Sequence, residues 1–283
     1  MNLKAWITLA RPFTLPIMIV FFMLGPALAG TITYRSLVAL IGVTFVLFGT
    51  HFFNAACDYI SGADRIGEDT SKIYSNATLI LPGMLVDIRK VEIASLIFSV
   101  LGGIILIYLN SLLIIPYLIG SLGGIIYSTH LKRWGLGELA MVVVYGIGLV
   151  MTGYIAETGE FSLNILPVAL LPGMFMGLLY TIDQYQDVPA DRKMGINNIA
   201  GFLEKKRLMS YYIDIWIIIL ILTHLVLMKS GFLPMSSCFG LCGYIGLFFA
   251  ARKVDKKPDI GFIITMITLL IVFTLIDLGL YFL

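Results

Sequence analysis

Two clusters of acidic residues interrupt a chain that otherwise carries few charges. Charged residues make up 13% of the sequence, whereas hydrophobic residues make up 59%. The first cluster contains Asn54, Asp58 and Asp64, and the second contains Asp183, Asp187 and Asp191. Because grouped carboxylates repel one another, this grouping indicates that a cation lies between them. Mg²⁺ is typically held by one or two carboxylates together with phosphate oxygens of a substrate. The sequence therefore predicts a magnesium site that handles a phosphorylated substrate.

The spacing within each cluster suits a helix. The first two members of each cluster are four positions apart, so on a helix their side chains share one face. Gly62 allows the chain to turn, which can return Asp64 to the first pair. In the second cluster Pro189 removes a backbone donor and favours a kink, so the spacing leaves open whether the helix continues to Asp191. One acidic pair at a helix end is often a solvated surface, but two pairs with the same spacing favour a site.

Basic side chains near these clusters are candidates for binding a diphosphate. Arg binds phosphate oxygens through a two-pronged fork, and Lys acts as a point charge. We expect the diphosphate to contact the amide of Asn54 and four cations, Arg65, Lys132, Arg192 and Lys193. Loops on the inner side of a membrane also carry positive residues for topological reasons, and this alternative stays open.

The elements that must position these residues are membrane-spanning helices. The mean hydropathy of +0.97 over 283 residues is typical of a membrane protein, in which each helical span needs about 20 apolar residues. Helices are favoured over a β-barrel because the apolar runs do not alternate with polar residues. We predict a single all-α transmembrane domain over residues 1–283. Its nine spans are expected at roughly 12–30, 36–57, 92–109, 110–127, 137–155, 165–184, 210–228, 231–251 and 258–282.

The positive residues predict how the chain is oriented. If the N-terminus is inside, seventeen of the 19 Lys and Arg residues fall on the inner side, and only Arg35 and Lys229 fall outside. Positive residues favour the cytoplasmic side. We therefore expect a multi-pass protein of the cell membrane whose N-terminus and two acidic loops are cytoplasmic. Basic residues at 205–207 and 252–257 are expected to anchor the chain to anionic lipid headgroups.

Taken in order, these motifs resemble those of the UbiA superfamily of intramembrane prenyltransferases, which have nine helices and paired Asp-rich loops. The stretch 54–64 resembles the first Asp-rich motif of the family, and the stretch 183–191 resembles the second. The sequence Arg-Pro-Phe-Thr-Leu-Pro at 11–16 is similar to the N-terminal signature. The resemblance extends along most of the chain.

Further residues resemble the branch that prenylates 1,4-dihydroxy-2-naphthoate in menaquinone biosynthesis. They are Thr78-Leu79 and Tyr127, followed by Gly-Leu-Gly-Glu at 135–138. Three positions depart from this branch. Cys57 stands where an Asn is usual, Asp183 is closer to the hydroxybenzoate branch, and Asn198 stands where a Thr is expected.

The resemblance implies Mg²⁺-dependent transfer of an isoprenyl group from a prenyl diphosphate to an aromatic acceptor within the membrane. The favoured acceptor is 1,4-dihydroxy-2-naphthoate, and the alternatives are hydroxybenzoate or another lipid or ring. Asp58, Asp187 and Tyr127 are the expected catalytic residues. The expected metal ligands are Asn54, Asp58, Asp64, Asp183, Asp187 and Asp191. We also expect membrane lipids as partners, and no nucleic acid.

Aromatic and intramembrane polar residues offer further candidates. Tyr127, Tyr180 and Tyr185 are placed to stabilise an allylic cation through their π faces, although interfacial tyrosines are common in membrane proteins. His51 is a candidate for orienting the first cluster. For Asp214 and Asp277, a position at the membrane interface is the simpler reading.

Two other classes of protein compete with a prenyltransferase. A transporter would place its ionisable residues near the middle of the bilayer, whereas the acids here gather at the cytoplasmic ends of spans. A phosphatase acting on diphosphate lipids would need a His or another nucleophile within the clusters, which offer none. Both comparisons favour the enzyme that transfers a prenyl group.

Overall fold

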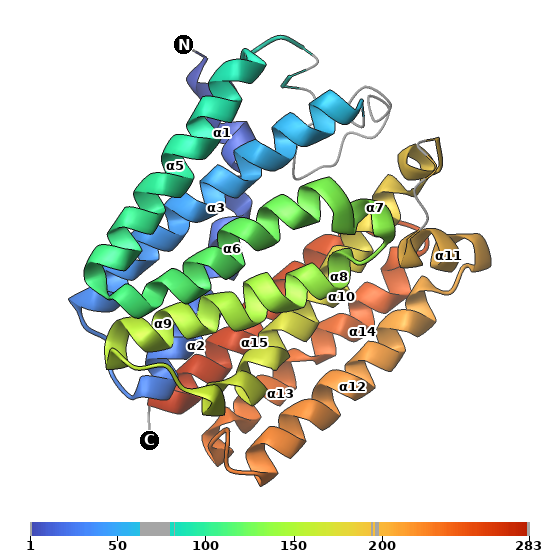
Figure 1. Cartoon of the computed structure of the whole chain (residues 1–283). Helices are drawn as coiled ribbons and strands as arrows, with labels where there is room; N and C mark the ends of the chain where they lie inside the picture. Colours follow the sequence, from blue (N-terminus) through green and yellow to red (C-terminus); the bar gives the residue numbers. More distant parts are fainter. Residues whose placement is uncertain (1, 63–79, 82, 194, 196–197, 282–283) are drawn as a thin grey trace.

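A computed structural model describes residues 2–281 apart from 63–79, 82, 194 and 196–197. All the regular elements that it describes are helical (Figure 1). Nine helical spans in this part of the chain are long and apolar enough to cross a membrane. The predicted all-α fold with nine spans is therefore confirmed, and the chain is a multi-pass membrane protein.

Some spans consist of two α-helices joined by a short 3₁₀, π-helical or irregular turn. The first five spans contain α1 (Leu3–Ala10) with α2 (Leu15–Ala29), α3 (Tyr34–Ser61), α5 (Ile88–Leu109), α6 (Ile114–Ile126), and α8 (Gly137–Met141) with α9 (Leu149–Thr158). The last four contain α10 (Leu166–Lys193), α12 (Met209–Lys229), α13 (Phe239–Gly243) with α14 (Ile245–Val254), and α15 (Pro258–Tyr281). Two short helices, α7 (Lys132–Trp134) and α11 (Ile199–Lys206), lie between spans.

The first span starts earlier than predicted and is bent. Asn2 caps α1 by accepting a hydrogen bond from the Ala5 amide at 3.2 Å, which starts the helix before the predicted boundary at Pro12. Arg11 ends α1 in the left-handed backbone conformation, with φ of 51°, and Pro12 begins a new turn that leads into α2. This bend turns the Arg11 side chain toward the interior of the bundle, where it lines a cavity.

The division between the third and fourth spans lies at Asn110, as predicted. This residue has extended backbone angles, and its side-chain oxygen accepts a hydrogen bond from the Leu112 amide at 2.8 Å. Its side-chain nitrogen also donates to the Gly159 carbonyl at 3.3 Å. Asn110 therefore ends one helix, starts the next, and ties this turn to the end of α9.

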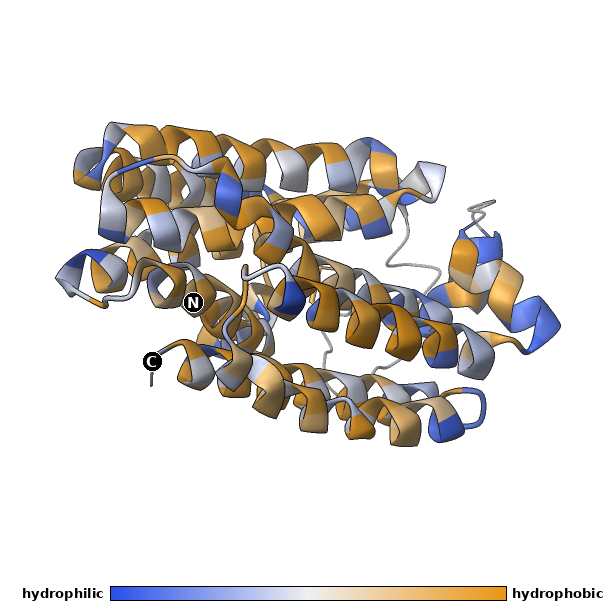
Figure 2. Cartoon of the chain, turned by 90° about the horizontal axis from the view of Figure 1, so that it is seen from below, coloured by the Kyte–Doolittle hydropathy of each residue, from blue (hydrophilic) through white to orange (hydrophobic). Residues whose placement is uncertain are grey.

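Close packing between helices depends on small residues. A Cβ atom added at Gly25 of α2 would lie 2.3 Å from the Val150 carbonyl oxygen, and one added at Gly153 of α9 would lie 2.4 Å from the Phe22 carbonyl oxygen. The two helices thus meet backbone to backbone, as small residues allow in membrane bundles. Figure 2 shows hydrophobic residues along the lengths of the helices and hydrophilic residues gathered toward their ends.

Among the spans that the structure describes, the one containing α10 is the most enclosed. In its most apolar stretch of 18 residues, 72% of the residues are buried. Helix α10 continues through Pro172 and Pro189 to Lys193, so all three acids of the second cluster lie on one helix. The C-terminal ends of α3 and α10 reach the same end of the bundle, beside α7 and α11 (Figure 1). The fold therefore brings Asn54 and Asp58 of the first cluster to the same end of the molecule as the second cluster, although about 120 residues separate the clusters in sequence.

Candidate active site

A cavity of about 280 Å³ is lined at one end by residues of both acidic clusters. Asn54 and Asp58 come from the last eight residues of α3, which ends before its cap at Gly62. Helix α10 contributes all three aspartates of the second cluster, Asp183, Asp187 and Asp191, together with Gln184. The remaining wall is largely apolar, so one cavity joins a polar, acidic end to a hydrophobic interior.

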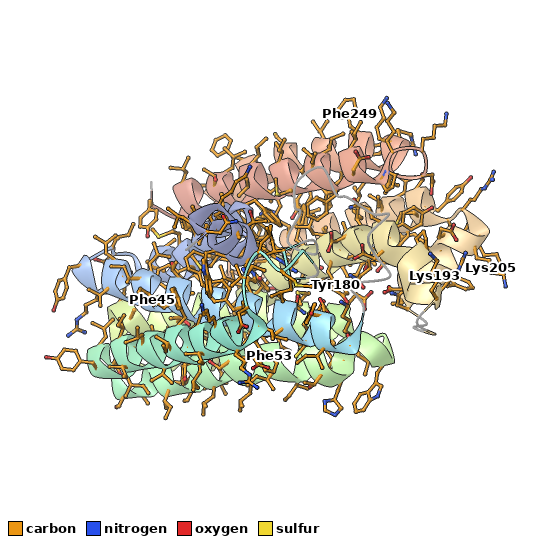
Figure 3. The ribbon with its side chains drawn as sticks, turned by 90° about the horizontal axis from the view of Figure 1, so that it is seen from above. Phe45, Phe53, Tyr180, Lys193, Lys205 and Phe249 are labelled. Atoms are coloured by element: carbon orange, nitrogen blue, oxygen red, sulfur yellow. The ribbon has the colours of Figure 1, made fainter. Side chains whose placement is uncertain are left out.

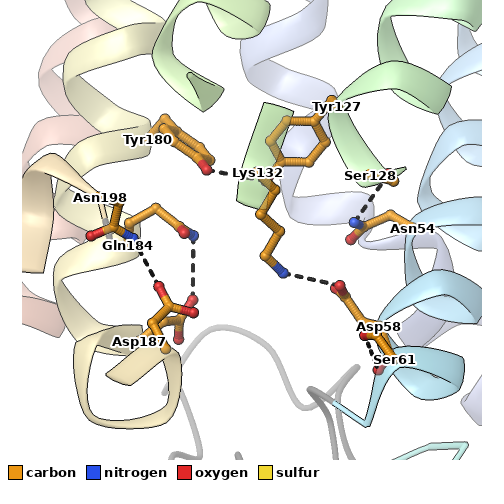
Figure 4. Close-up of polar contacts among 11 residues, drawn as sticks. Asn54, Asp58, Ser61, Tyr127, Ser128, Lys132, Tyr180, Gln184, Asp187 and Asn198 are labelled. Atoms are coloured by element: carbon orange, nitrogen blue, oxygen red, sulfur yellow. Dashed lines mark hydrogen bonds and ion pairs between the residues drawn. The ribbon is translucent and has the colours of Figure 1, made fainter. Parts of the chain in front are cut away.

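Lys132 lies between the two clusters (Figure 4). Its Nζ atom is 3.0 Å from Asp58 Oδ1, and both side chains are mostly shielded from solvent. Burial alone lowers the pKa of the Lys132 ammonium, but the carboxylates of Asp58 and, farther away, Asp187 raise it above its ordinary value. The lysine therefore stays cationic at neutral pH and supplies a fixed positive charge at the acidic end of the cavity.

A π-helical stretch, Tyr127–Leu131, sets the position of this lysine. Such stretches insert an extra residue into a helix and often occur at functional sites. Here the stretch directs both Tyr127 and Ser128 to the cavity. The Ser128 hydroxyl accepts a hydrogen bond from Asn54 Nδ2 at 3.3 Å, which fixes the buried amide of the first cluster.

In the second cluster, amide side chains hold two of the carboxylates. Gln184 Nε2 donates to Asp187 Oδ2 at 3.4 Å, and Asn198 Nδ2 donates to Asp191 Oδ2 at 2.8 Å. The side-chain oxygen of Asn198 also caps α11 by accepting from the Gly201 amide at 2.8 Å. Asn198 thus connects the start of α11 to a predicted metal ligand.

Two tyrosines stand over the acidic end of the cavity. The Tyr127 hydroxyl donates to the Tyr180 hydroxyl at 3.5 Å, and the ring centroids are 5.8 Å apart in an edge-to-face arrangement. Gly137 leaves room for this pair, because a Cβ atom there would lie 2.3 Å from the Tyr180 hydroxyl oxygen. Tyr185 does not lie where the sequence analysis expected it. It is not among the residues that line the cavity, and its hydroxyl donates a hydrogen bond to Asp255 Oδ1 at 3.1 Å.

Arg11 and His51 line the cavity as well. Arg11 Nε is buried and makes no hydrogen bond within the described part of the chain. His51 Nδ1 is 2.7 Å from the Ala10 carbonyl oxygen. The structure thus shows His51 fixing the end of α1 next to Arg11, whereas the sequence suggested a role in orienting the first cluster.

Other predicted site residues lie outside this cavity or outside the described residues. Arg192 pairs with Glu204 at 2.6 Å, and both side chains are exposed. Lys193 is also exposed, and Figure 3 shows it near the same end of the bundle as Lys205. Asp64 and Arg65 fall among the residues that the structure does not describe.

The two remaining intramembrane acids have separate environments. Asp214, near the start of α12, pairs with Arg252 at 3.3 Å. Asp277 is buried in α15, and its Oδ1 atom has no hydrogen-bond partner among the described residues. The bundle encloses the Asp277 side chain, four residues before the end of α15, and its position at the membrane interface stays a prediction.

The donors at the acidic end suit a hard cation such as Mg²⁺. Carboxylate oxygens come from both clusters, and Asn54 and Gln184 add amide oxygens. Within the described ranges, however, no three His, Cys, Asp or Glu side chains are close enough to form a metal-binding group by themselves. Mg²⁺ is commonly bound by one or two carboxylates and completed by waters and substrate phosphates. The arrangement fits an ion that is bound together with a phosphorylated substrate.

Comparison with known proteins identifies the family. The model of the UbiA prenyltransferase family matches residues 14–263, which is most of the chain. The chain belongs to this family. It is therefore a membrane enzyme that transfers prenyl groups from prenyl diphosphates. In this UbiA family member, the cavity brings Asn54 and Asp58 of α3 together with the three aspartates of α10.

Individual relatives are distant in sequence. A 1,4-dihydroxy-2-naphthoate octaprenyltransferase of Haemophilus influenzae is 26% identical over 224 residues, which cover 70% of this chain and 69% of that protein. A digeranylgeranylglyceryl phosphate synthase structure has a TM-score of 0.71 at 16% identity, covering 100% of this chain and 99% of the other. A UbiA homologue of Archaeoglobus fulgidus bound to DMAPP and Mg²⁺ has a TM-score of 0.66 at 15% identity, covering 96% and 98%. These structural matches establish the shared fold.

Several residues of the site carried little signal in the sequence. Ser128, Gln184 and Tyr145, which all line the cavity, are ordinary polar or aromatic residues of apolar spans. Nothing in their spacing sets them apart. Asn198 was noticeable only as a departure from a family pattern. Arg11 belonged to a recognised signature, but its place in the cavity follows from the bend after α1.

Proposed function

We propose that this enzyme transfers an isoprenyl group to an aromatic acid, with 1,4-dihydroxy-2-naphthoate as the favoured acceptor. The observation that carries the proposal is the single cavity, which joins an acidic end to an apolar interior. A prenyl diphosphate has the same division, since its diphosphate is strongly charged and its tail is a hydrocarbon. The acidic end then takes the diphosphate with its cations, and the apolar walls take the tail.

The residues at the acidic end divide the binding of the diphosphate among them. Mg²⁺, when bound, neutralises the leaving diphosphate and stabilises the charge that develops on it. Asp58, Asp187 and their neighbours Asn54, Asp183 and Asp191 would hold the metal. Lys132 Nζ, at 3.0 Å from Asp58, is positioned to contact phosphate oxygens next to the metal ligands. The outward-facing Arg192 and Lys193 are proposed as weaker contributors to diphosphate binding from outside the cavity.

Tyr127 and Tyr180 are proposed to protect and stabilise the reacting end of the prenyl group. As the allylic C–O bond breaks, positive charge develops on the allylic carbons. Aromatic faces attract such a charge, most effectively where water is excluded. The edge-to-face contact and the hydroxyl hydrogen bond hold the two rings in place at the boundary between the polar and apolar parts of the cavity.

The acceptor is proposed to be an acid because of Arg11. Its buried Nε donor lines the cavity and has no partner in the described part of the protein. A buried guanidinium donor without a partner is costly, and a carboxylate is its natural ligand. The match to a 1,4-dihydroxy-2-naphthoate octaprenyltransferase favours a naphthoate, and a hydroxybenzoate is the alternative with the same acidic group.

The acceptor can be tested by following its carboxylate. The carbon of the electron-rich naphthoate ring that bears the carboxylate attacks the prenyl group, which leaves its diphosphate. Loss of CO₂ from that ring carbon then restores aromaticity. We expect the purified enzyme to release labelled CO₂ from carboxyl-labelled 1,4-dihydroxy-2-naphthoate while a prenylated product appears in the lipid extract. A prenylated hydroxybenzoate that keeps its carboxylate, without any naphthoate product, would contradict the favoured acceptor.

We also propose that the acidic end of the cavity faces the cytoplasm. The support is the distribution of positive charge, since seventeen of 19 Lys and Arg residues fall on that side of the predicted topology. In intact cells, a membrane-impermeant thiol reagent should label a Cys introduced at Glu160 and should not label one introduced at Lys193. If the reagent labels the Cys at position 193 from outside, the proposed orientation is wrong.

A further inference from the structure

Four side chains line the apolar end of the cavity. They are Val43 of α3, Leu106 of α5, Tyr117 of α6 and Thr152 of α9. Leu106 and Thr152 are only 1% and 3% exposed, so the protein packs closely behind these two side chains. Directly after Thr152, Gly153 meets α2 backbone to backbone, so α2 and α9 pack tightly at this point. We call this end of the cavity its floor.

Tyr117 is held in this floor by the neighbouring helix. A Cβ atom added at Gly103 of α5 would lie 2.6 Å from Tyr117 Cζ and 3.0 Å from its hydroxyl oxygen. The ring therefore rests against the backbone of α5 and has no room to move toward that helix. Because an aromatic side chain has few rotamers, a ring packed in this way is a stiff barrier.

The depth of the cavity can be compared with the length of a prenyl tail. Eleven positions separate Val43 from Asn54 on α3, which corresponds to about 16 Å along the helix. One isoprene unit adds four chain bonds, one more than an amino-acid residue, and so extends about 4–5 Å. The distance from the acidic end to the floor thus matches about three to four isoprene units.

We infer that Tyr117 limits the length of the prenyl chain that this enzyme accepts. The inference rests on the proposed function, because it assumes that the apolar cavity holds the tail of a prenyl diphosphate. Tails of up to about four units fit above the tyrosine ring, and a longer tail would have to displace it. Tyr117 acts here as a specificity residue, distant from the acidic residues that bind the diphosphate.

A larger residue at Gly120 is expected to have the opposite effect to removing the Tyr117 ring, because it would shorten the space for the tail. It lines the cavity one helical turn nearer the acidic end than Tyr117. A Cβ atom added there meets only Val46 Cγ1, at 3.6 Å, which is an ordinary contact. A larger side chain at this position therefore projects into the space that the tail would occupy, and replacing Gly within a helix favours the helix itself.

The test compares kcat/KM for geranyl, geranylgeranyl and octaprenyl diphosphate in the wild type and three variants. We expect the wild type to prefer geranylgeranyl over octaprenyl diphosphate. Tyr117→Ala should raise the octaprenyl-to-geranylgeranyl ratio at least about tenfold, and Gly120→Leu should lower the geranylgeranyl-to-geranyl ratio at least about tenfold, as expected for gaining or losing space for several methylene groups. Leu118→Ala is the matched control, because Leu118 is 42% exposed on the outer side of the same helix.

The outcomes separate this inference from the proposed function. If the wild type and all variants use the three chain lengths with the same relative rates, the tail does not end at Tyr117 and the inference is wrong. If the wild type uses none of the three diphosphates, the proposed function fails instead. Activity with geranyl diphosphate shows for each variant that it is folded, so a change in the ratios reports on chain length.

Discussion

Replacing either Asp58 or Asp187 by Asn is expected to reduce turnover at least about a hundredfold. Each change keeps the size of the side chain but removes one of the negative charges that hold cations at the acidic end of the cavity. The loss should be similar for both, because the two residues come from different helices and line the same end of one cavity. Initial rates with saturating prenyl diphosphate and acceptor provide the measurement.

Asp214→Asn is the matched control for these variants. Asp214 pairs with Arg252 at 3.3 Å and is not among the residues that line the cavity. We expect this variant to keep most of its activity. Near-normal rates for both Asp58→Asn and Asp187→Asn would refute the assignment of the acidic end as the catalytic site.

Lys132→Ala is expected to lower kcat/KM for the prenyl diphosphate by about a hundredfold, the usual effect of removing one strong electrostatic group from an active site. The ammonium of Lys132 is held 3.0 Å from Asp58 and stays cationic because nearby carboxylates raise its pKa. Without it, the acidic end loses its fixed positive charge, and Asp58 loses its partner. Steady-state kinetics with varied diphosphate concentration would measure the effect.

Two further variants make this result specific. Lys132→Arg keeps the charge and should recover part of the activity, since Arg also binds phosphate oxygens. Lys253→Ala removes an exposed cation at the end of α14, away from the cavity, and should have little effect. If Lys132→Ala binds and turns over the diphosphate as the wild type does, then Lys132 serves only as a structural partner of Asp58.

The membrane-spanning part of the fold could be predicted because hydrophobic runs of this length have few alternatives. Nine spans overlap the predicted ones in the described residues, and the division at Asn110 is as predicted. The start of the first span was less accessible to sequence reasoning. Its early helix depends on a cap at Asn2 and a left-handed residue at Arg11, neither of which changes the local hydropathy.

The meeting of the two acidic clusters was also predictable, because each follows a helix that runs toward the same side. Their immediate partners were not. Lys132 reaches Asp58 through a π-helical stretch, and Asn198 reaches Asp191 from the start of α11. Both contacts join residues from different helices or loops, so they depend on how the helices pack. A sequence pattern with a period of one helix turn contains no information about them.

The different environments of Tyr180 and Tyr185 also depend on how the helices pack. Tyr180 and Tyr185 are five positions apart on α10, so they point to different sides of the helix. Tyr180 faces the cavity and contacts Tyr127, whereas Tyr185 faces the loop that carries Asp255. The sequence analysis predicted the same role for both tyrosines, stabilising an allylic cation, because both lie near a membrane surface. Only the packing of the helices shows that their environments differ.

The most direct test of the account follows a labelled prenyl diphosphate in the presence and absence of a divalent cation. The purified enzyme is incubated with labelled geranylgeranyl diphosphate and 1,4-dihydroxy-2-naphthoate, with either Mg²⁺ or EDTA. We predict that label passes to a prenylated aromatic product, with release of diphosphate, only when Mg²⁺ is present. Equal transfer in EDTA, or conversion of the label to prenyl alcohol alone, would contradict a metal-dependent prenyl transfer at the acidic end of the cavity.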